Sequence, residues 1–119
     1  MKIKTSDLSG VQLDWAVAKC ELLLGQDYTL SIDHDGFVNR VNFGGMYPEW
    51  SSDWAEGGPI IEREQIALFL NGDDEWTAED GWHRARGETP LVAAMRCYVA
   101  NKLGDEVEIP EELKETANA

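Results

Sequence analysis

A segment rich in tryptophan and glycine in the middle of the chain carries the side chains best suited to hold a ligand. Pro59 suits the first turn of a helix, and Gly58 before it can serve as a permissive capping residue. We therefore expect the segment to lead into the free amides of a helix N-terminus. Such amides can bind an anion or a phosphate, and neighbouring aromatic rings can stack on a base. The aromatic and glycine residues concerned are Tyr47, Trp50, Trp54, Gly57 and Gly58.

Positive charge for such a pocket would come from arginines, of which Arg63, Arg84, Arg86 and Arg96 are candidates. The purely structural alternative is that the tryptophans anchor a loop on the core and the glycines let it turn. The Gly-Gly-Pro run lacks the glycine and lysine spacing of a P-loop, so its phosphate signal is weak. The residues that we predict to bind a ligand are Trp15, Tyr47, Trp54, Gly57, Gly58, Arg63 and Arg96.

Carboxylates in the same region raise the alternative of a metal-dependent hydrolase. Asp53, Glu56 and Glu62 could share a metal or act as acid and base. No histidine lies at ligand spacing, and Glu62 and Glu64, two apart on a helix, do not face the same way. Solvated charges are the better interpretation, and we predict no metal, no cofactor and no catalytic residue.

The cysteines and histidines add no clear chemistry. Cys20 and Cys97 lie within helical patterns among apolar neighbours, which predicts two buried thiols. His34 and His83 lie in turn-like segments, and His83 follows an aromatic residue in a polar loop, where it could be functional or incidental. A Cys–His pair stays open but nothing in the sequence favours it.

Acidic residues gather in two clusters, which suggests the first alternative to a ligand-binding protein, ahead of the hydrolase: a decoy that imitates the phosphates of DNA and blocks a DNA-binding protein. The competing interpretation is that these charges serve solubility. One cluster holds Asp73, Asp74, Glu75, Glu79 and Asp80, and the other holds Asp105, Glu106, Glu108, Glu111, Glu112 and Glu115.

The elements that would position these residues can be read from periodicity and turn signals. A helix is predicted from Ser9 to Gly25, and a hairpin over 28–44 around a turn at 33–36. That turn resembles a calcium loop, but Asn42 would stand where the loop needs its bidentate glutamate. A short helix should begin at Pro59.

The second half of the chain reads as a hairpin followed by a helix. Strands are predicted over 66–70 and 75–78, joined by an Asn-Gly turn, and a polar loop over 79–88. The last helix is capped by Thr89 and ends at Gly104. A short edge strand or docked segment should follow at residues 107–109.

Length and charge limit what such a chain can be. It has 119 residues, 43% of them hydrophobic, which is enough for one core without disulfides. Ten Lys and Arg against 23 Asp and Glu give a net charge of −13. This argues against binding to nucleic acid through its phosphates and against docking on an anionic membrane. No apolar run is long enough to span a bilayer, and the N-terminus lacks a signal-peptide pattern.

Three ordered blocks of the sequence resemble one family, the NinX type of small phage and prophage proteins. They are Leu13-Asp14-Trp15-Ala16-Val17-Ala18, the run from Ser52 to Glu64, and Thr89-Pro90-Leu91-Val92-Ala93-Ala94-Met95-Arg96 with the 99–104 segment after it. The same blocks resemble the phage ABA-sandwich domain. The resemblance implies an α-β-α layered fold, a phage origin and a location in the host cytoplasm, but no reaction and no catalytic residues.

We therefore expect an α+β protein, a single-domain α-β-α sandwich with antiparallel hairpins and helices near both ends. The domain should span residues 1–110, followed by an acidic, frayed tail over 111–119. The expected function is that of a phage accessory protein, not an enzyme, that binds a small ligand or a host protein, with counter-defence as one role. It should bind no nucleic acid or membrane directly, and self-association is open, since an apolar patch could remain for a partner.

Overall fold

The N-terminal part of the chain forms a strand, a short turn of helix and a long helix. In the computed structural model, which describes residues 1–26, 29–36, 38–41, 49–72 and 74–113, β1 covers Lys2–Lys4, η1 covers Thr5–Asp7 and α1 covers Gly10–Leu23. Ser9 is the N-cap residue of α1, although its side chain makes no capping hydrogen bond. The predicted first helix is confirmed, whereas β1 was not expected.

The first hairpin also matches its prediction. β2 (Thr29–Ile32) pairs antiparallel with β3 (Val38–Val41). In the turn between them Gly36 has a φ of 83°, and the Asp33 carboxylate accepts the amide of Asp35 at 3.0 Å. The carboxylate thus stabilises the turn itself, in line with the rejection of a calcium loop.

The short helix begins earlier than predicted. α2 covers Trp54–Glu64, and Asp53 is its N-cap, with the side chain accepting the Ala55 amide at 2.9 Å. The prediction that Gly58 caps a helix starting at Pro59 is therefore wrong, because an aspartate cap five residues upstream starts the helix first. Both glycines of the Gly-Gly-Pro run lie inside the helix.

The second hairpin continues into a third strand. β4 (Ala67–Leu70), β5 (Trp76–Glu79) and β6 (Arg84–Gly87) form an antiparallel sheet in that order. The predicted polar loop over 79–88 is thus partly wrong, since Glu79 ends β5 and Arg84–Gly87 form β6. Its inward positions are the small Ala85 and Gly87, which lack the apolar bulk that signals a strand. A Cβ on Gly87 would lie 2.5 Å from the amide nitrogen of Ala93, so this glycine lets the strand approach the last helix closely.

The last helix and strand close the fold. α3 covers Pro90–Leu103, with the Thr89 hydroxyl accepting the Val92 amide at 3.1 Å. The predicted helix from Thr89 to Gly104 is confirmed. β7 (Glu106–Glu108) then pairs antiparallel with β1, so the expected short strand exists and its partner is the N-terminal strand.

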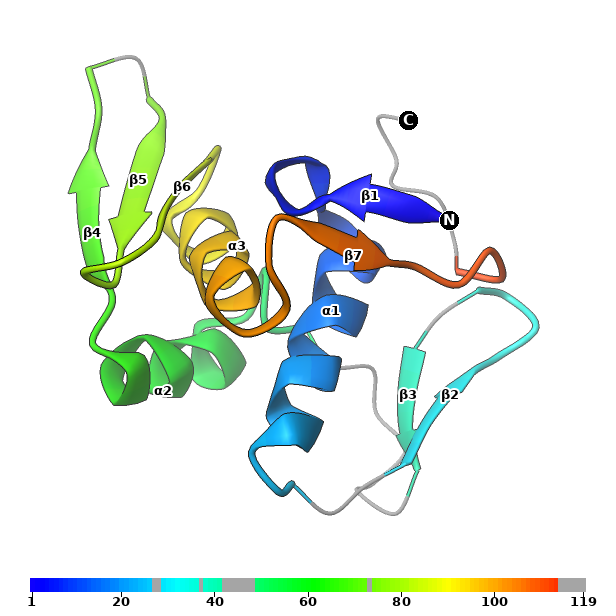
Figure 1. Ribbon diagram of the computed structural model, residues 1–119. Coiled ribbons are helices and arrows are strands. Elements are labelled where there is room, and N and C mark those ends of the chain that lie inside the picture. The colour runs from blue at the N-terminus through cyan, green and yellow to red at the C-terminus, as the bar shows by residue number, and fades with distance from the viewer. Residues whose placement is uncertain (27–28, 37, 42–48, 73, 114–119) are drawn as a thin grey trace.

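Helix α3 lies at the centre of the molecule. It packs on the β4–β5–β6 sheet on one side and on α1 on another, while α2 lies across it and α1 in turn contacts β3 (Figure 1). The α+β class with antiparallel pairs and helices near both ends is confirmed. The core reaches Leu113, which is buried, beyond the expected end of the domain at residue 110. Fully buried side chains include Leu8, Leu13, Val17, Met95, Tyr98, Val99 and Ile109.

Candidate binding site

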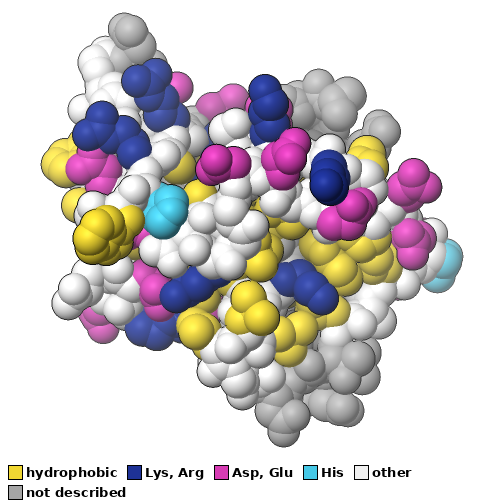
Figure 2. All heavy atoms as spheres, viewed as in Figure 1, with side chains coloured by type: hydrophobic (Ala, Val, Ile, Leu, Met, Phe, Trp, Pro, Cys, Tyr) yellow, Lys and Arg dark blue, Asp and Glu magenta, His cyan; other side chains and the backbone are white. Residues whose placement is uncertain are grey.

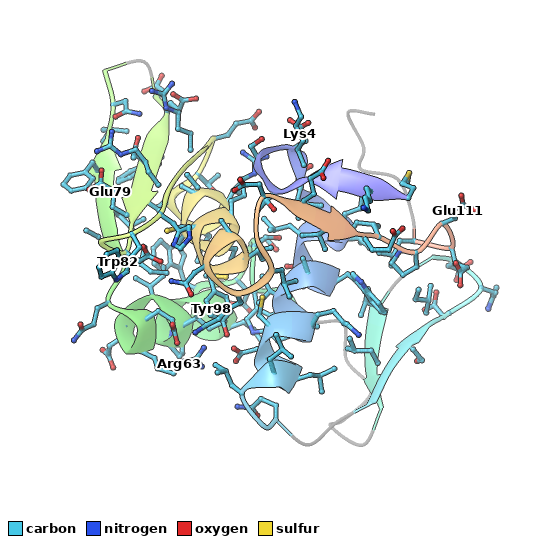
Figure 3. The ribbon with its side chains drawn as sticks, in the orientation of Figure 1. Lys4, Arg63, Glu79, Trp82, Tyr98 and Glu111 are labelled. Carbon is cyan, nitrogen blue, oxygen red and sulfur yellow. The ribbon has the colours of Figure 1, made fainter. Side chains whose placement is uncertain are left out.

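A pocket of about 370 Å³ opens where four segments meet. Its walls come from the end of β1 with η1, from β6, from α3 and from the start of β7, and Figure 3 shows Lys4 on the β1 side. Three positively charged side chains reach it from three of these segments. The lining residues are Lys4, Thr5, Ser6, Arg84, Ala85, Arg96, Ala100, Asp105 and Glu106.

Arg96 carries a positive charge into this pocket from α3. Its Nε donates to the carbonyl of Leu8 at 2.7 Å and its Nη1 to the carbonyl of Arg86 at 2.8 Å. Both acceptors are neutral, and among the residues that the structure describes Arg96 forms no ion pair. Burial of the guanidinium lowers its pKa, against the opposing effect of two carboxylates nearby. The pocket therefore contains a partly desolvated cation that two fixed carbonyls hold in place.

The wall of the pocket formed by β1, η1 and the start of β7 carries Lys4 together with two acidic residues. Thr5 joins this wall to the loop after α3, because its hydroxyl donates to the Gly104 carbonyl at 2.6 Å and its amide to the Asp105 carbonyl at 2.8 Å. The side chains of Asp105 and Glu106 follow directly. A ligand in this pocket would thus meet Arg84 and Arg96 on one side, and Lys4 beside the acidic residues Asp105 and Glu106 on the other.

Arg84 connects this pocket to a second one, of about 220 Å³, beside the β5–β6 turn. This second pocket is lined by the turn itself and holds Trp82, whose side chain is 89% exposed. Figure 3 shows Trp82 at the outer margin of the molecule, on the side of the three-stranded sheet. Arg84 also forms an ion pair with Glu79. An exposed indole and a guanidinium thus lie on neighbouring parts of one surface.

The turn that carries Trp82 is held by one carboxylate. Asp80 accepts the amides of Trp82 at 2.8 Å and His83 at 2.6 Å, and the side-chain amide of Asn101 at 2.7 Å. Burial disfavours the ionised carboxyl, but these hydrogen bonds outweigh it and hold the pKa of Asp80 below its ordinary value. The buried Nδ1 of His83 lies 3.5 Å from the same carboxylate without a hydrogen bond. Trp82 is therefore presented by a backbone that is already ordered.

Of the two predicted glycines, Gly57 allows close packing of α2. A Cβ on Gly57 would lie 2.5 Å from the carbonyl oxygen of Trp50 and 2.6 Å from Cδ2 of Leu91. The Gly57 amide donates to the Asp53 carbonyl at 2.9 Å, so it does not face a ligand. The expectation that both glycines precede a helix and offer free amides is therefore wrong, because the helix has already begun.

The aromatic residues around these glycines have different positions. Trp50 is buried in the core, whereas Trp54 at the start of α2 is 53% exposed. Within the described part of the chain, a Cβ on Gly58 would meet the ring of Trp54, at 3.8 Å. Tyr47 lies outside the described residues. Trp54 and Gly58 thus lie on the exposed side of α2. That these two residues contact a ligand stays a prediction.

Arg63 is part of a network that joins the three helices. Its Nη2 donates to the carboxylate of Glu21 at 2.8 Å and to the hydroxyl of Tyr98 at 2.9 Å, and its Nε to Glu64 at 2.8 Å. The Tyr98 hydroxyl also donates to Glu21. Burial first, and then the bond to Glu21, raise the pKa of Tyr98, while the bond to Glu21 raises that of Arg63. Figure 3 shows Arg63 and Tyr98 where α2 meets α3, so this arginine is used to connect helices.

The remaining predicted residue, Trp15, lines a separate hollow. That pocket, of about 690 Å³, lies beside the β2–β3 hairpin and also includes Leu30 and Ile32. The amino group of Lys19 lies 5.7 Å from the centre of the Trp15 ring. Trp15 and Arg96 thus line different pockets.

A buried carboxylate on α1 was not expected from the sequence. Asp14 accepts the Ser51 amide at 2.9 Å, and burial raises its pKa to about 7 against the opposing effect of that hydrogen bond. It thereby connects α1 to the loop before α2. The available signal was a lone acidic residue next to the apolar stripe of a predicted helix. For Lys4, which lies far from the arginines in sequence, there was no such signal.

Several of the carboxylates behind the two alternative functions are used within the fold. Glu79 pairs with Arg84, Glu75 lies 3.8 Å from Arg86, and Asp80 is bound as described above. Figure 2 shows acidic and basic side chains interspersed over the face that it presents. For the hydrolase alternative, Asp53 caps α2, and the described residues include no group of three potential ligands that could hold a metal.

Comparisons with known proteins agree with the resemblance seen in the sequence. No curated protein matches the chain. None of the described helices is long and apolar enough to cross a membrane. The family model described as "Bacteriophage P22, NinX" matches residues 4–102, a range that includes α1, α2, nearly all of α3 and the pocket residues Lys4, Arg84 and Arg96. Because this match covers most of the 119 residues, the chain belongs to the NinX family of bacteriophage proteins.

Proposed function

We propose that this chain is a non-catalytic binding protein that takes an anionic group of a small ligand into the pocket of Lys4, Arg84 and Arg96. The phage family supports action in the cytoplasm of the infected host, with counter-defence as the role. The observation that carries the proposal is the charge of Arg96, which is partly desolvated and hydrogen-bonded only to neutral carbonyls in the described part of the chain.

An anion should gain more binding free energy in this pocket than at the open surface of the protein. The protein has a net charge of −13, so a general attraction for anions is absent and binding must come from the local cations. Arg96 is already fixed by its two carbonyl partners, so little side-chain entropy is lost when a ligand binds. The acidic wall formed by Asp105 and Glu106 favours ligands that also carry hydrogen-bond donors.

Titration with pyrophosphate, followed by NMR of the backbone amides, tests this proposal. We expect shifts at η1, at β6 and around Arg96 and Ala100 of α3. Lys4→Gln should lose affinity by about tenfold or more, because a charge-assisted contact contributes roughly 1.5–3 kcal/mol. Arg86→Gln is the matched control, since it removes the same charge from a residue that does not line the pocket. The proposal is wrong if pyrophosphate causes no shifts there, or if both variants lose affinity equally.

A further inference from the structure

Strand β4 forms one edge of the three-stranded sheet and consists only of apolar residues. The strand order is β4-β5-β6, and Figure 1 shows β4 on the outer margin, with no labelled element beyond it. Its residues are Ala67, Leu68, Phe69 and Leu70. The other edge strand, β6, carries Arg84 and Arg86, as is typical of edges that are protected from pairing. Only one edge of this sheet therefore has such protection.

The backbone groups of β4 that face outward can be assigned from the hairpin. The Asn71 amide donates to the Glu75 carbonyl at 2.6 Å, so Asn71 directs its amide toward β5. Backbone groups alternate along an antiparallel ladder, so Phe69 also faces β5 while Leu68 and Leu70 face away. In the described part of the chain no strand pairs with that side. Two amides and two carbonyls thus point outward along an apolar edge.

The side chains of this edge are exposed although they are large. Phe69 is 49% exposed on the face turned away from α3, and Leu70 is 60% exposed beside the helical face. Two carboxylates of the same sheet are balanced by arginines, because Glu79 pairs with Arg84 and Glu75 lies 3.8 Å from Arg86. In a protein with a net charge of −13, this is a surface that a second copy can approach with little local repulsion.

We propose that β4 pairs antiparallel with β4 of a second copy, about a two-fold axis that passes through Phe69. In this register Leu68 lies opposite Leu70 of the second copy, and the outward amides and carbonyls of both residues form hydrogen bonds across the axis. The two Phe69 rings lie opposite each other, which is a favourable cross-strand pair. The partner is a second copy because the strand is complementary to itself in this register, and the two-fold pairing closes with no free apolar edge.

The interface is small and the dimer is correspondingly weak. A pair of four-residue strands buries less than a standard interface, so association should be detected at tens to hundreds of micromolar protein. Each copy carries a charge of −13, and added salt screens the repulsion between them. We therefore expect association to strengthen when the ionic strength is raised.

Sedimentation equilibrium of the full chain over a concentration series tests the proposal. The wild type should shift from the 13.3 kDa monomer to a dimer, and Phe69→Lys should raise the dissociation constant at least tenfold, because two lysines then face each other on the axis. Leu23→Lys is the matched control, since it places the same charge on an exposed leucine of α1 and should leave the dimer unchanged. Thermal unfolding of each variant confirms that the monomer stays folded.

A charge-swap experiment tests the register itself. Phe69→Lys and Phe69→Glu should each be monomeric alone, whereas an equimolar mixture should form a heterodimer, since the axis then joins opposite charges. The proposal is overturned if the wild type stays monomeric at millimolar concentration and high salt. It is equally overturned if Phe69→Lys and Leu23→Lys change association alike, or if the mixture does not associate.

Discussion

Replacing each of the two adjacent glycines of α2 by alanine should change the stability in opposite directions. A Cβ at position 57 would lie 2.5 Å from the Trp50 carbonyl oxygen and 2.6 Å from Cδ2 of Leu91, distances that no real Cβ contact tolerates. The leucine methyl can move, but the carbonyl belongs to the backbone beside a buried tryptophan. Gly57→Ala must therefore push α2 away from the loop that precedes it.

The magnitudes follow from these contacts. Overpacking of this kind costs about 1–3 kcal/mol, which exceeds the gain from a better helix former, about 0.5–1 kcal/mol. At position 58 the neighbour among the described residues is the exposed Trp54 ring, at the ordinary contact distance of 3.8 Å. Gly58→Ala should therefore benefit from the higher helix propensity of alanine without steric cost, and stabilise the protein by about 0.5–1 kcal/mol.

Urea denaturation of both variants and the wild type, followed by circular dichroism, measures these changes. The unfolding free energy should fall for Gly57→Ala and rise for Gly58→Ala, with equal slopes against urea concentration. The packing argument is refuted if Gly57→Ala is neutral or stabilising, or if the two variants shift together. Pyrophosphate affinity should be unchanged in Gly58→Ala, because this glycine does not line the basic pocket.

Three further perturbations test the interior of the protein. Tyr98→Phe should destabilise the fold by about 1.5–3 kcal/mol in urea denaturation, because the buried Glu21 carboxylate loses a hydrogen-bond donor. Asp14, whose pKa burial raises from 3.8 to about 7, holds its proton in the folded state where the unfolded chain has lost it. The unfolding free energy should therefore fall as the pH rises from about 4 to about 7, and Asp14→Asn should remove that part of the slope. Burial raises the pKa of both Cys20 and Cys97 to about 12, so neither should react with a thiol reagent at pH 8 until denaturant is added.

Elements defined by local signals could be predicted from the sequence, and elements defined by distant contacts could not. The helix from Thr89 to Gly104 has its cap, its first-turn proline and its terminal glycine within the segment itself. β1 has no such signal, because its partner is β7 at the other end of the chain. The start of α2 was misplaced because glycine and proline suggested a break, whereas Gly57 is in fact required for close packing inside the helix.

The candidate site was predicted only in part for the same reason. Arg84 and Arg96 were recognised as sources of positive charge, but they were assigned to the tryptophan and glycine segment. Tertiary packing instead brings them together with Lys4, whose neighbours in sequence give no indication of a pocket. Trp82 was noted only as part of a polar loop, and its exposure depends on the Asp80 hydrogen bonds.

The pairing of β1 with β7 has a consequence for how the protein reaches its final structure in the cell. The carbonyl of Met1 accepts the amide of Ile109 at 2.8 Å, so the first residue of this ladder finds its partner 108 positions later. A ribosome makes the chain from the N-terminus, and β1 therefore stays without its partner until almost all of these residues have been synthesised. The wall of the basic pocket that β1 and β7 share can thus form only after residues 106–108 have been synthesised, which makes it a late event in folding.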